Sequence, residues 1–163
     1  MGRDKAFLMG SAVAAAVREA AGTAILVGDP ARYASLGYPV IPDLWPGEGP
    51  LAGIVAALRH TASDGNLIVA CDMPMVSAGF LKQLLDAWTG GILAPVNPAG
   101  YLEPLCAVYG RDALPGLETA FLSGVRKVAA AFERLPLTRY PVAEPWHFQN
   151  INTPEEWACY DAQ

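Results

Sequence analysis

Apolar residues along the chain recur with two different spacings, and segments of the two kinds alternate. Recurrence at i, i+3, i+4 and i+7 predicts amphipathic helices, whereas short continuous apolar runs predict strands. The first spacing predicts helices at residues 12–21, 51–58, 77–88 and 113–122, with another start at 153. The apolar runs predict strands at residues 23–28, 39–41, 66–72, 92–96, 105–109 and 135–142. Because alternating strands and helices form right-handed βαβ units, we expect a three-layer α/β fold with a mostly parallel sheet.

The run at residues 66–74 is the most strand-like in the chain. Its apolar part leads into Cys71 and the carboxylate of Asp72, and a Met-Pro pair then ends the strand. Such a run is typical of a buried parallel strand, and open α/β sheets bind ligands beyond the carboxyl ends of their strands. We therefore predict that Asp72 is a Mg²⁺ ligand, since Mg²⁺ prefers one or two carboxylates plus phosphate and water oxygens. The alternative is a local role for Asp72 as a helix cap or turn former.

Length and composition narrow the class of protein. The 163 residues predict one domain, residues 1–163, large enough to bury a core, and no apolar run predicts a membrane span. Three widely spaced cysteines, Cys71, Cys106 and Cys159, together with the lack of a signal pattern, predict free thiols and a cytoplasmic location. Cys71 and Cys106 lie in apolar runs, so we expect both to be small buried hydrophobes. The net charge of −5 disfavours nucleic acid as a partner but allows an anionic ligand at a local basic cluster.

A glycine-rich loop precedes the clearest predicted helix. Its sequence is Gly-Glu-Gly-Pro-Leu-Ala-Gly, from Gly47 to Gly53. Glycine lets a flat base or sugar approach the backbone closely, and Asp43 just upstream could accept hydrogen bonds from a base or ribose. The predicted nucleotide-binding residues of this segment are Asp43, Gly49, Pro50, Leu51 and Gly53. The alternative is a flexible loop in which Pro50 only marks the start of the helix.

Two segments near the ends of the sequence carry further candidates. Lys5 could neutralise phosphate charge, although a frayed, solvated terminus is the ordinary alternative. Asn150 and Asn152 flank one isoleucine, which puts both amides on one side of an extended segment as neutral ligands to a metal or substrate. The alternative for this segment is a capped turn, in which Thr153 caps the next helix.

Taken in order, these segments resemble one known family. The chain carries Met-Gly-x-Asp-Lys, Gly-Pro-Leu-Ala-Gly, Cys-Asp-Met-Pro, Pro-Leu and Asn-Ile-Asn-Thr-Pro-Glu, from Met1 to about Trp157. This order is similar to that of the molybdenum cofactor guanylyltransferases. The resemblance implies a Rossmann-like nucleotidyltransferase fold and Mg²⁺-dependent transfer of GMP from GTP to molybdopterin, with release of pyrophosphate. It implies a phosphate contact for Lys5, a nucleotide contact for Asp43, and a role in metal and nucleotide binding for Asp72. It also implies protein partners among molybdoenzymes or other proteins of cofactor biosynthesis.

The resemblance also has departures. The family places a strand and the loop Leu-Ala-Gly-Gly-x-x-x-Arg before Met-Gly-x-Asp-Lys, whereas the given sequence starts at that Met. Gly28 occupies a position where some members have an Asn that contacts the nucleotide. One alternative is that the protein starts upstream of this Met. Otherwise we expect the lost strand to leave open edges on both of its neighbours, and the lost glycines to impair transfer of GMP. A cytidylyl- or sugar-phosphate nucleotidyltransferase and a non-catalytic nucleotide- or partner-binding module remain the alternative functions.

Overall fold

The computed structural model describes residues 2–143 and residue 148, with side chains from Met9 onward. Its α-helices are α1 (Gly2–Ala21), α2 (Pro30–Tyr33), α3 (Pro50–His60), α4 (Ala78–Ala87) and α5 (Leu114–Leu122), with 3₁₀ turns at Ala34–Leu36, Arg111–Ala113 and Val128–Phe132. Its strands are β1 (Leu26–Val27), β2 (Val40–Ile41), β3 (Gly65–Val69), β4 (Ile92–Val96), β5 (Cys106–Gly110) and β6 (Leu137–Pro141). No helix within the described residues is long and apolar enough to cross a membrane.

The helices begin where the sequence offers caps. Pro50 stands at the first position of α3, where a missing N–H costs nothing. The hydroxyl of Ser77 accepts a 3.2 Å hydrogen bond from the Phe80 amide and caps α4. The carboxylate of Asp29 accepts a 2.9 Å bond from the Ala31 amide and starts α2, where the sequence predicted a simple turn. The helices predicted after Pro50 and Ser77 are therefore confirmed.

The described strands form two sheets. The larger has the order β3-β5-β4-β6, and the smaller consists of β1 beside β2. The ladders β1–β2 and β4–β6 are parallel, whereas β5 runs antiparallel to both β3 and β4. The prediction of an α/β fold is confirmed, but the larger sheet is mixed and not mostly parallel as expected. The expectation that residues 66–72 form a buried parallel strand is wrong, because β3 ends at Val69, is antiparallel to β5 and lies half-buried at the edge of its sheet.

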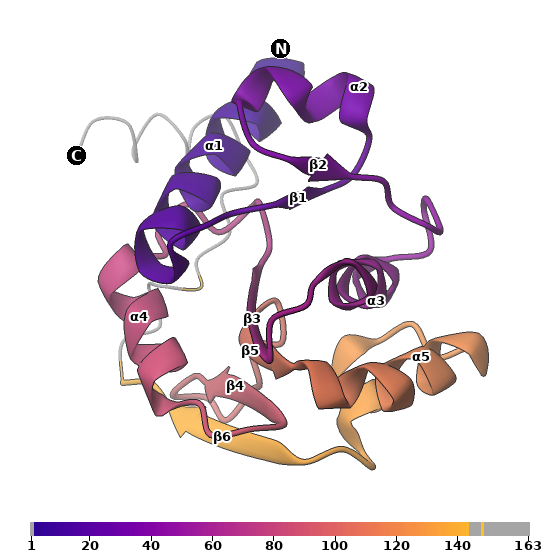
Figure 1. Ribbon diagram of the computed structural model, residues 1–163. Coiled ribbons are helices and arrows are strands. Elements are labelled where there is room, and N and C mark those ends of the chain that lie inside the picture. Colours follow the sequence, from indigo (N-terminus) through magenta and orange to yellow (C-terminus); the bar gives the residue numbers. More distant parts are fainter. Residues whose placement is uncertain (1, 144–147, 149–163) are drawn as a thin grey trace.

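Three layers are visible in the packing of the larger sheet (Figure 1). Successive residues of β5 enter opposite cores, because side chains alternate across a strand. Ala107 and Tyr109 pack with α3 and α5, whereas Cys106 and Val108 pack with α4. The buried Tyr109 hydroxyl donates a 2.7 Å hydrogen bond to the Pro104 carbonyl, so its polar atom is satisfied. Helices thus cover both faces of this sheet.

The first helix differs from the prediction. Residues 12–21 are helical as expected, but α1 begins at Gly2 and includes the backbone of Lys5. The interpretation of Lys5 as part of a frayed terminus is therefore wrong for its backbone. Val13 and Ala14 of α1 are buried, and Ala16, Val17 and Ala20 pack against the core on the α4 side of the larger sheet. Strand 23–28 is shorter than predicted, and the predicted helix start at 153 lies outside the described residues.

Candidate functional site

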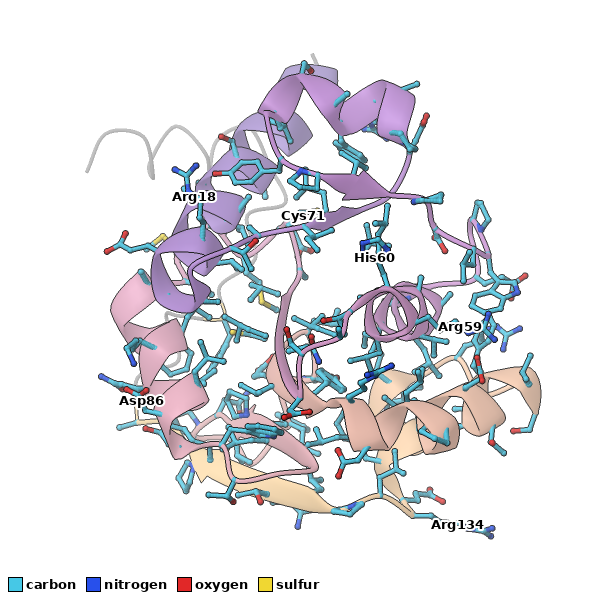
Figure 2. All side chains as sticks on the ribbon, viewed as in Figure 1. Arg18, Arg59, His60, Cys71, Asp86 and Arg134 are labelled. Atoms are coloured by element: carbon cyan, nitrogen blue, oxygen red, sulfur yellow. The ribbon has the colours of Figure 1, made fainter. Side chains whose placement is uncertain are left out.

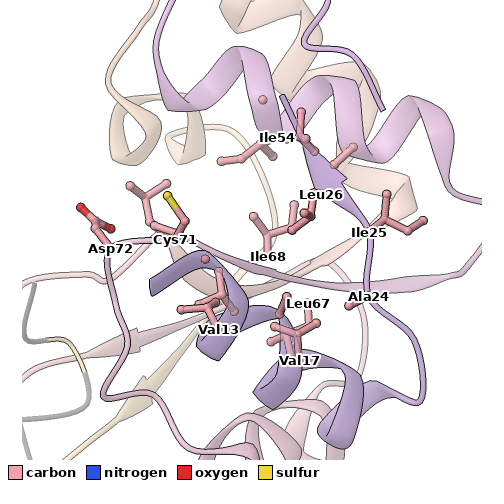
Figure 3. Close-up of a pocket in the computed structure, with 18 of the residues that line it drawn as sticks. Val13, Val17, Ala24, Ile25, Leu26, Ile54, Leu67, Ile68, Cys71 and Asp72 are labelled. Atoms are coloured by element: carbon pink, nitrogen blue, oxygen red, sulfur yellow. The ribbon is translucent and has the colours of Figure 1, made fainter. Parts of the chain in front are cut away.

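A cavity of about 490 Å³ lies between the two sheets. Helix α1 and helix α3 supply two of its walls, and segments of β1 and β3 supply the other two. Most lining side chains are apolar, and Asp72 is the acidic residue among them. In Figure 3, Asp72 and Cys71 lie at one end of this cavity, while Ala24 and Ile25 lie toward the other. The cavity is therefore apolar along most of its length and polar at the end where Asp72 lies.

Asp72 is placed by the turn that follows β3. This turn is closed by a 3.4 Å hydrogen bond from the Met73 amide to the Ala70 carbonyl, and the Asp72 side chain is half-buried. No hydrogen bond or ion pair joins its carboxylate to another residue in the described part of the chain. Since Ser77 caps α4, the alternative role of Asp72 as cap of that helix is wrong. Its oxygens are available to a ligand.

Three groups set the electrostatics at this end of the cavity: the Asp72 carboxylate, the Cys71 thiol and the positive charge of Arg32. Desolvation by the surrounding chain raises the pKa of the Cys71 thiol, and the nearby Asp72 carboxylate raises it further. The positive charge of Arg32 opposes both effects, which places a guanidinium within electrostatic reach of this end. Cys71 is exposed to solvent, so the expectation that it is a buried hydrophobe is wrong. Cys106 is buried, and the same expectation is confirmed there. Figure 2 labels Cys71 close to the small sheet.

The glycine-rich loop enters the same cavity from the α3 side. Gly49 precedes α3 with φ of 89°, a backbone conformation that strongly favours glycine. Pro50 and Gly53 line the cavity, and a Cβ added at Gly53 would meet nothing within 4 Å. Leu51, in contrast, is 0% exposed and belongs to the core beneath α3. Its contact with a nucleotide stays a prediction, while Pro50 and Gly53 share the cavity with Asp72.

Asp43 lies outside the cavity lining and has a partner in its own loop. Its Oδ1 accepts a 3.0 Å hydrogen bond from the Trp45 amide, which closes a local turn. The side chain is half-buried and keeps its second oxygen for other donors. The contact of Asp43 with a nucleotide stays a prediction.

Gly28 directly follows β1. Its amide donates a 2.9 Å hydrogen bond to the Ile41 carbonyl. A Cβ at this position would lie 2.8 Å from the Tyr33 ring, and Tyr33 itself lines the cavity. The absence of a side chain at Gly28 therefore lets Tyr33 pack closely against β1, a packing role that the sequence did not reveal.

The remaining predicted residues have no described side chains. Lys5 lies in the first part of α1, and Asn150 and Asn152 lie outside the described residues. Within the described part of the chain, no group of three His, Cys, Asp or Glu residues could hold a metal ion. Asp72 as sole carboxylate still suits Mg²⁺, since that ion takes its other ligands from phosphate and water.

Sequence reasoning missed a cluster that holds the loop before α3. We call it the loop brace, and it consists of Trp45, Glu48, Arg59, Glu118, Phe121 and Arg126. Trp45 packs against Phe121 with ring centroids 4.8 Å apart, and the Arg59 guanidinium lies 5.3 Å from the Trp45 ring centroid. Arg126 Nε donates a 2.7 Å hydrogen bond to Glu48. Figure 2 labels Arg59 near α5. The loop is therefore attached to both α3 and α5.

Comparison with solved structures identifies the fold. The chain matches 2-C-methyl-D-erythritol 4-phosphate cytidylyltransferase from Thermus thermophilus with a TM-score of 0.72 and 17% identity, covering 94% of this chain and 87% of that one. At this identity the likeness shows the fold alone, which is the Rossmann-like fold of nucleotidyltransferases.

The particular family follows from the sequence. The profile of the MobA-like NTP transferase domain matches residues 1–137, and the chain belongs to this family. A probable molybdenum cofactor guanylyltransferase from Clostridium perfringens is 30% identical over 142 residues, which are 82% of this chain and 72% of that protein. Molybdopterin-guanine dinucleotide biosynthesis protein A from Archaeoglobus fulgidus is 33% identical with a TM-score of 0.68, covering 85% of this chain and 76% of that one. The resemblance drawn from the ordered motifs is thus confirmed.

Proposed function

We propose that this nucleotidyltransferase transfers GMP from GTP to molybdopterin and releases pyrophosphate. The relatives named molybdenum cofactor guanylyltransferase support the substrates. The observation that carries the assignment of the site is the unpartnered, half-buried Asp72 carboxylate at the polar end of the cavity. A carboxylate so placed is a hard oxygen ligand beside a concave surface, which is where α/β folds bind nucleotides.

The reaction needs no protein nucleophile. The phosphate of molybdopterin is ionised at neutral pH, so one of its oxygens attacks the α-phosphorus of GTP as the bond to the pyrophosphate oxygen breaks. Asp72 would hold Mg²⁺, which when bound neutralises phosphate charge and orients the phosphates. Lys5 and the guanidinium of Arg32 are the proposed additional positive charges on the phosphates. Pro50 and the backbone at Gly49 and Gly53 are the proposed contacts for the base or ribose.

Asp43, Asn150 and Asn152 keep their predicted roles in this proposal. Asp43 would accept a hydrogen bond through the oxygen that Trp45 leaves unused. Asn150 and Asn152 are proposed as neutral ligands to the metal or the substrate. A molybdoenzyme or another protein of cofactor biosynthesis is the proposed recipient of the product, in the cytoplasm.

The experiment compares two Asp→Asn variants at opposite ends of one strand. Asp72→Asn should lower GMP transfer by roughly 10²-fold or more, because the change removes the charge that would bind the cation beside the reacting phosphates. Asp64→Asn makes the same chemical change at an exposed position before β3 and should leave the rate unchanged. Transfer is measured with radiolabelled GTP, molybdopterin and Mg²⁺, and folding of both variants is checked by circular dichroism. Equal rates for the two variants, both close to the rate of the parent in a version that carries the family's N-terminal strand and loop, would show that Asp72 is not the metal ligand.

A further inference from the structure

The loop brace holds the first end of the segment at residues 43–49. Oδ1 of Asp43 accepts a 3.0 Å hydrogen bond from the Trp45 amide. The Trp45 ring packs against Phe121 of α5, and the guanidinium of Arg59 from α3 lies beside the same ring. Helices α3 and α5 pack against each other (Figure 1). The Asp43 carboxylate is therefore oriented by one backbone bond and by a ring that two packed helices hold.

Arg126 holds the other end of this segment. Its Nε donates a 2.7 Å hydrogen bond to the Glu48 carboxylate, and its Nη1 donates a 2.9 Å bond to the Phe121 carbonyl. The guanidinium carbon lies 4.4 Å from the centroid of the Phe121 ring. Gly124, with φ of 97°, turns the chain after α5 and so brings Arg126 back over the end of that helix. Because Glu48 directly precedes Gly49, Arg126 fixes the chain where it enters α3.

The brace residues themselves lie outside the cavity. None of the six belongs to the cavity lining in the described part of the chain, whereas Pro50 and Gly53 do. The predicted contacts to a base or ribose lie on the braced segment, at Asp43 and Gly49, or directly after it, at Pro50. The brace can therefore influence a bound nucleotide through the shape of this segment, without contact of its own.

We propose that the loop brace preorganises residues 43–50 for the base of the nucleotide, and that Arg126 and Trp45 are positioning residues for base selectivity. A loop that is already ordered loses less conformational freedom when a ligand binds. A fixed loop also leaves polar groups unpaired opposite a wrong base, where a loose loop would adapt to it. The phosphates are proposed to bind around Asp72, so loss of the brace should weaken base recognition and preserve phosphate binding. This inference rests on the proposed function, which takes the loop as the contact for the base.

The ion pair between Glu48 and Arg126 contributes little to the stability of the whole fold. The two side chains are 49% and 45% exposed, and exposed ion pairs add little to the free energy of unfolding. A large effect of this pair on nucleotide affinity would therefore not follow from a loss of global stability. Arg126 thus allows the shape of the loop to be tested apart from the stability of the protein.

The first experiment measures the affinity of Arg126→Ala for two ligands by isothermal titration calorimetry with Mg²⁺. GTP carries a base, whereas inorganic tripolyphosphate carries phosphates alone. Arg126→Ala should bind GTP about tenfold more weakly than the parent, because the loop must then be ordered on binding. Its affinity for tripolyphosphate should stay close to that of the parent. Lys82→Ala is the matched control, since it removes the cation of an exposed ion pair with Asp86 on α4 and should change neither affinity.

Variants at Glu48 show whether the two charged residues act as a pair. Glu48→Ala should weaken GTP binding as much as Arg126→Ala does, and the double variant should bind no more weakly than either single variant. Glu48→Gln keeps an oxygen that can accept from Arg126 and should restore most of the affinity for GTP. Additive losses in the double variant would show that Glu48 contacts the nucleotide directly, and would overturn the role of the pair.

Base selectivity is tested at Trp45 with ATP as the second nucleotide. In Trp45→Ala the affinity for GTP should fall while the affinity for ATP changes much less, so that the preference for GTP over ATP shrinks severalfold. Trp45→Phe keeps a ring between Phe121 and Arg59 and should retain most of the preference. Circular dichroism checks that each variant folds. If Trp45→Ala does not fold, Arg126→Ala still provides the test.

The outcomes distinguish this inference from the proposed function. If Arg126→Ala binds GTP as tightly as the parent and still prefers it to ATP, the inference is overturned and the proposed function stands. Equal losses of affinity for GTP and tripolyphosphate would show general loosening of the protein, and would also overturn the inference alone. If the parent itself binds no GTP, or binds ATP equally well, both the proposed function and the inference are overturned.

Discussion

The half of the molecule built on the larger sheet is packed more completely than the half built on β1 and β2. In the larger sheet every residue of β5 is buried, and helices cover both faces. In the smaller half, β1 and β2 have two residues each, and α2 has no buried residue (Figure 1). The residues that line the candidate site come from both halves, with Asp72 from the well-packed one. A rigid half can thus hold the reactive group while a sparse half, with little stability of its own, adapts to the ligand.

A pair of truncations measures this contrast most directly. Leu84→Ala, at a position of 0% exposure in α4, should lower the free energy of unfolding by about 2–5 kcal/mol because it leaves a cavity. Ile25→Ala, at 43% exposure next to β1, should cost less than about 1 kcal/mol. Urea unfolding followed by circular dichroism gives both values. Similar losses for the two variants would mean that the halves are equally important for stability.

Nucleotides should stabilise the chain by binding at the boundary between the halves. At a concentration about a hundredfold above its dissociation constant, a ligand that binds only the folded state adds about 2.7 kcal/mol. We expect GTP with Mg²⁺ to raise the melting temperature more than ATP or CTP does. Thermal shift measurements with Asp72→Asn as control check this order. A larger shift with CTP would favour the cytidylyltransferase alternative.

Loss of the loop brace should loosen the loop at residues 42–49 more than it destabilises the whole molecule. Trp45→Ala removes the ring that lies between Arg59 and Phe121 and should destabilise the protein by about 1–3 kcal/mol. It should also increase proteolysis within residues 42–49, since the loop loses its attachment to α5. Arg59→Lys keeps the charge but loses the planar group beside the ring, and its effect should be smaller. Limited proteolysis with mass spectrometry distinguishes local loosening from global unfolding.

The smallest expected effect concerns the thiols. Burial raises the pKa of Cys106 to about 12, so its thiolate is scarce at any pH below that value. Cys71 also has a raised pKa but is exposed, so its alkylation should be slow at pH 7 and accelerate as the pH rises toward and beyond 9. Labelling of the native protein with iodoacetamide should modify Cys71 well before Cys106. Titration of the unfolded chain without reductant should count three thiols, and a count of one would reveal a disulfide.

The parts of the fold that could be predicted from sequence are those set by local spacing. The face of α3 and the cap of α4 depend on residues within a few positions of one another, and both were predicted. The direction of β3 was not, because an apolar run reports burial on the two faces of a strand and not the direction of its neighbours. The exposure of Cys71 was missed for a similar reason, since the strand ends two residues earlier than the apolar run.

In the candidate site, too, features set by local sequence could be predicted and long-range contacts could not. The position of Asp72 after a strand followed from sequence order, and Pro50 and Gly53 were placed beside a helix start that the pattern defined. The loop brace could not be predicted, because Trp45 and Phe121 meet across 76 positions of sequence, from 45 to 121. The charge of Arg32 near Cys71 likewise depends on how α2 lies over the sheet. Contacts of this kind need the tertiary structure.

The order of strands in the larger sheet has a consequence for synthesis on the ribosome. Strand β3 ends at Val69, but its partner β5 is complete only at Gly110, and β4 pairs with β6 only after Pro141 has been made. At roughly 5–20 residues per second, the nascent β3 segment remains without its neighbour for seconds. During that interval its apolar side chains and both of its edges are open to other molecules. A chaperone that binds extended apolar segments would therefore meet β3 before the sheet exists.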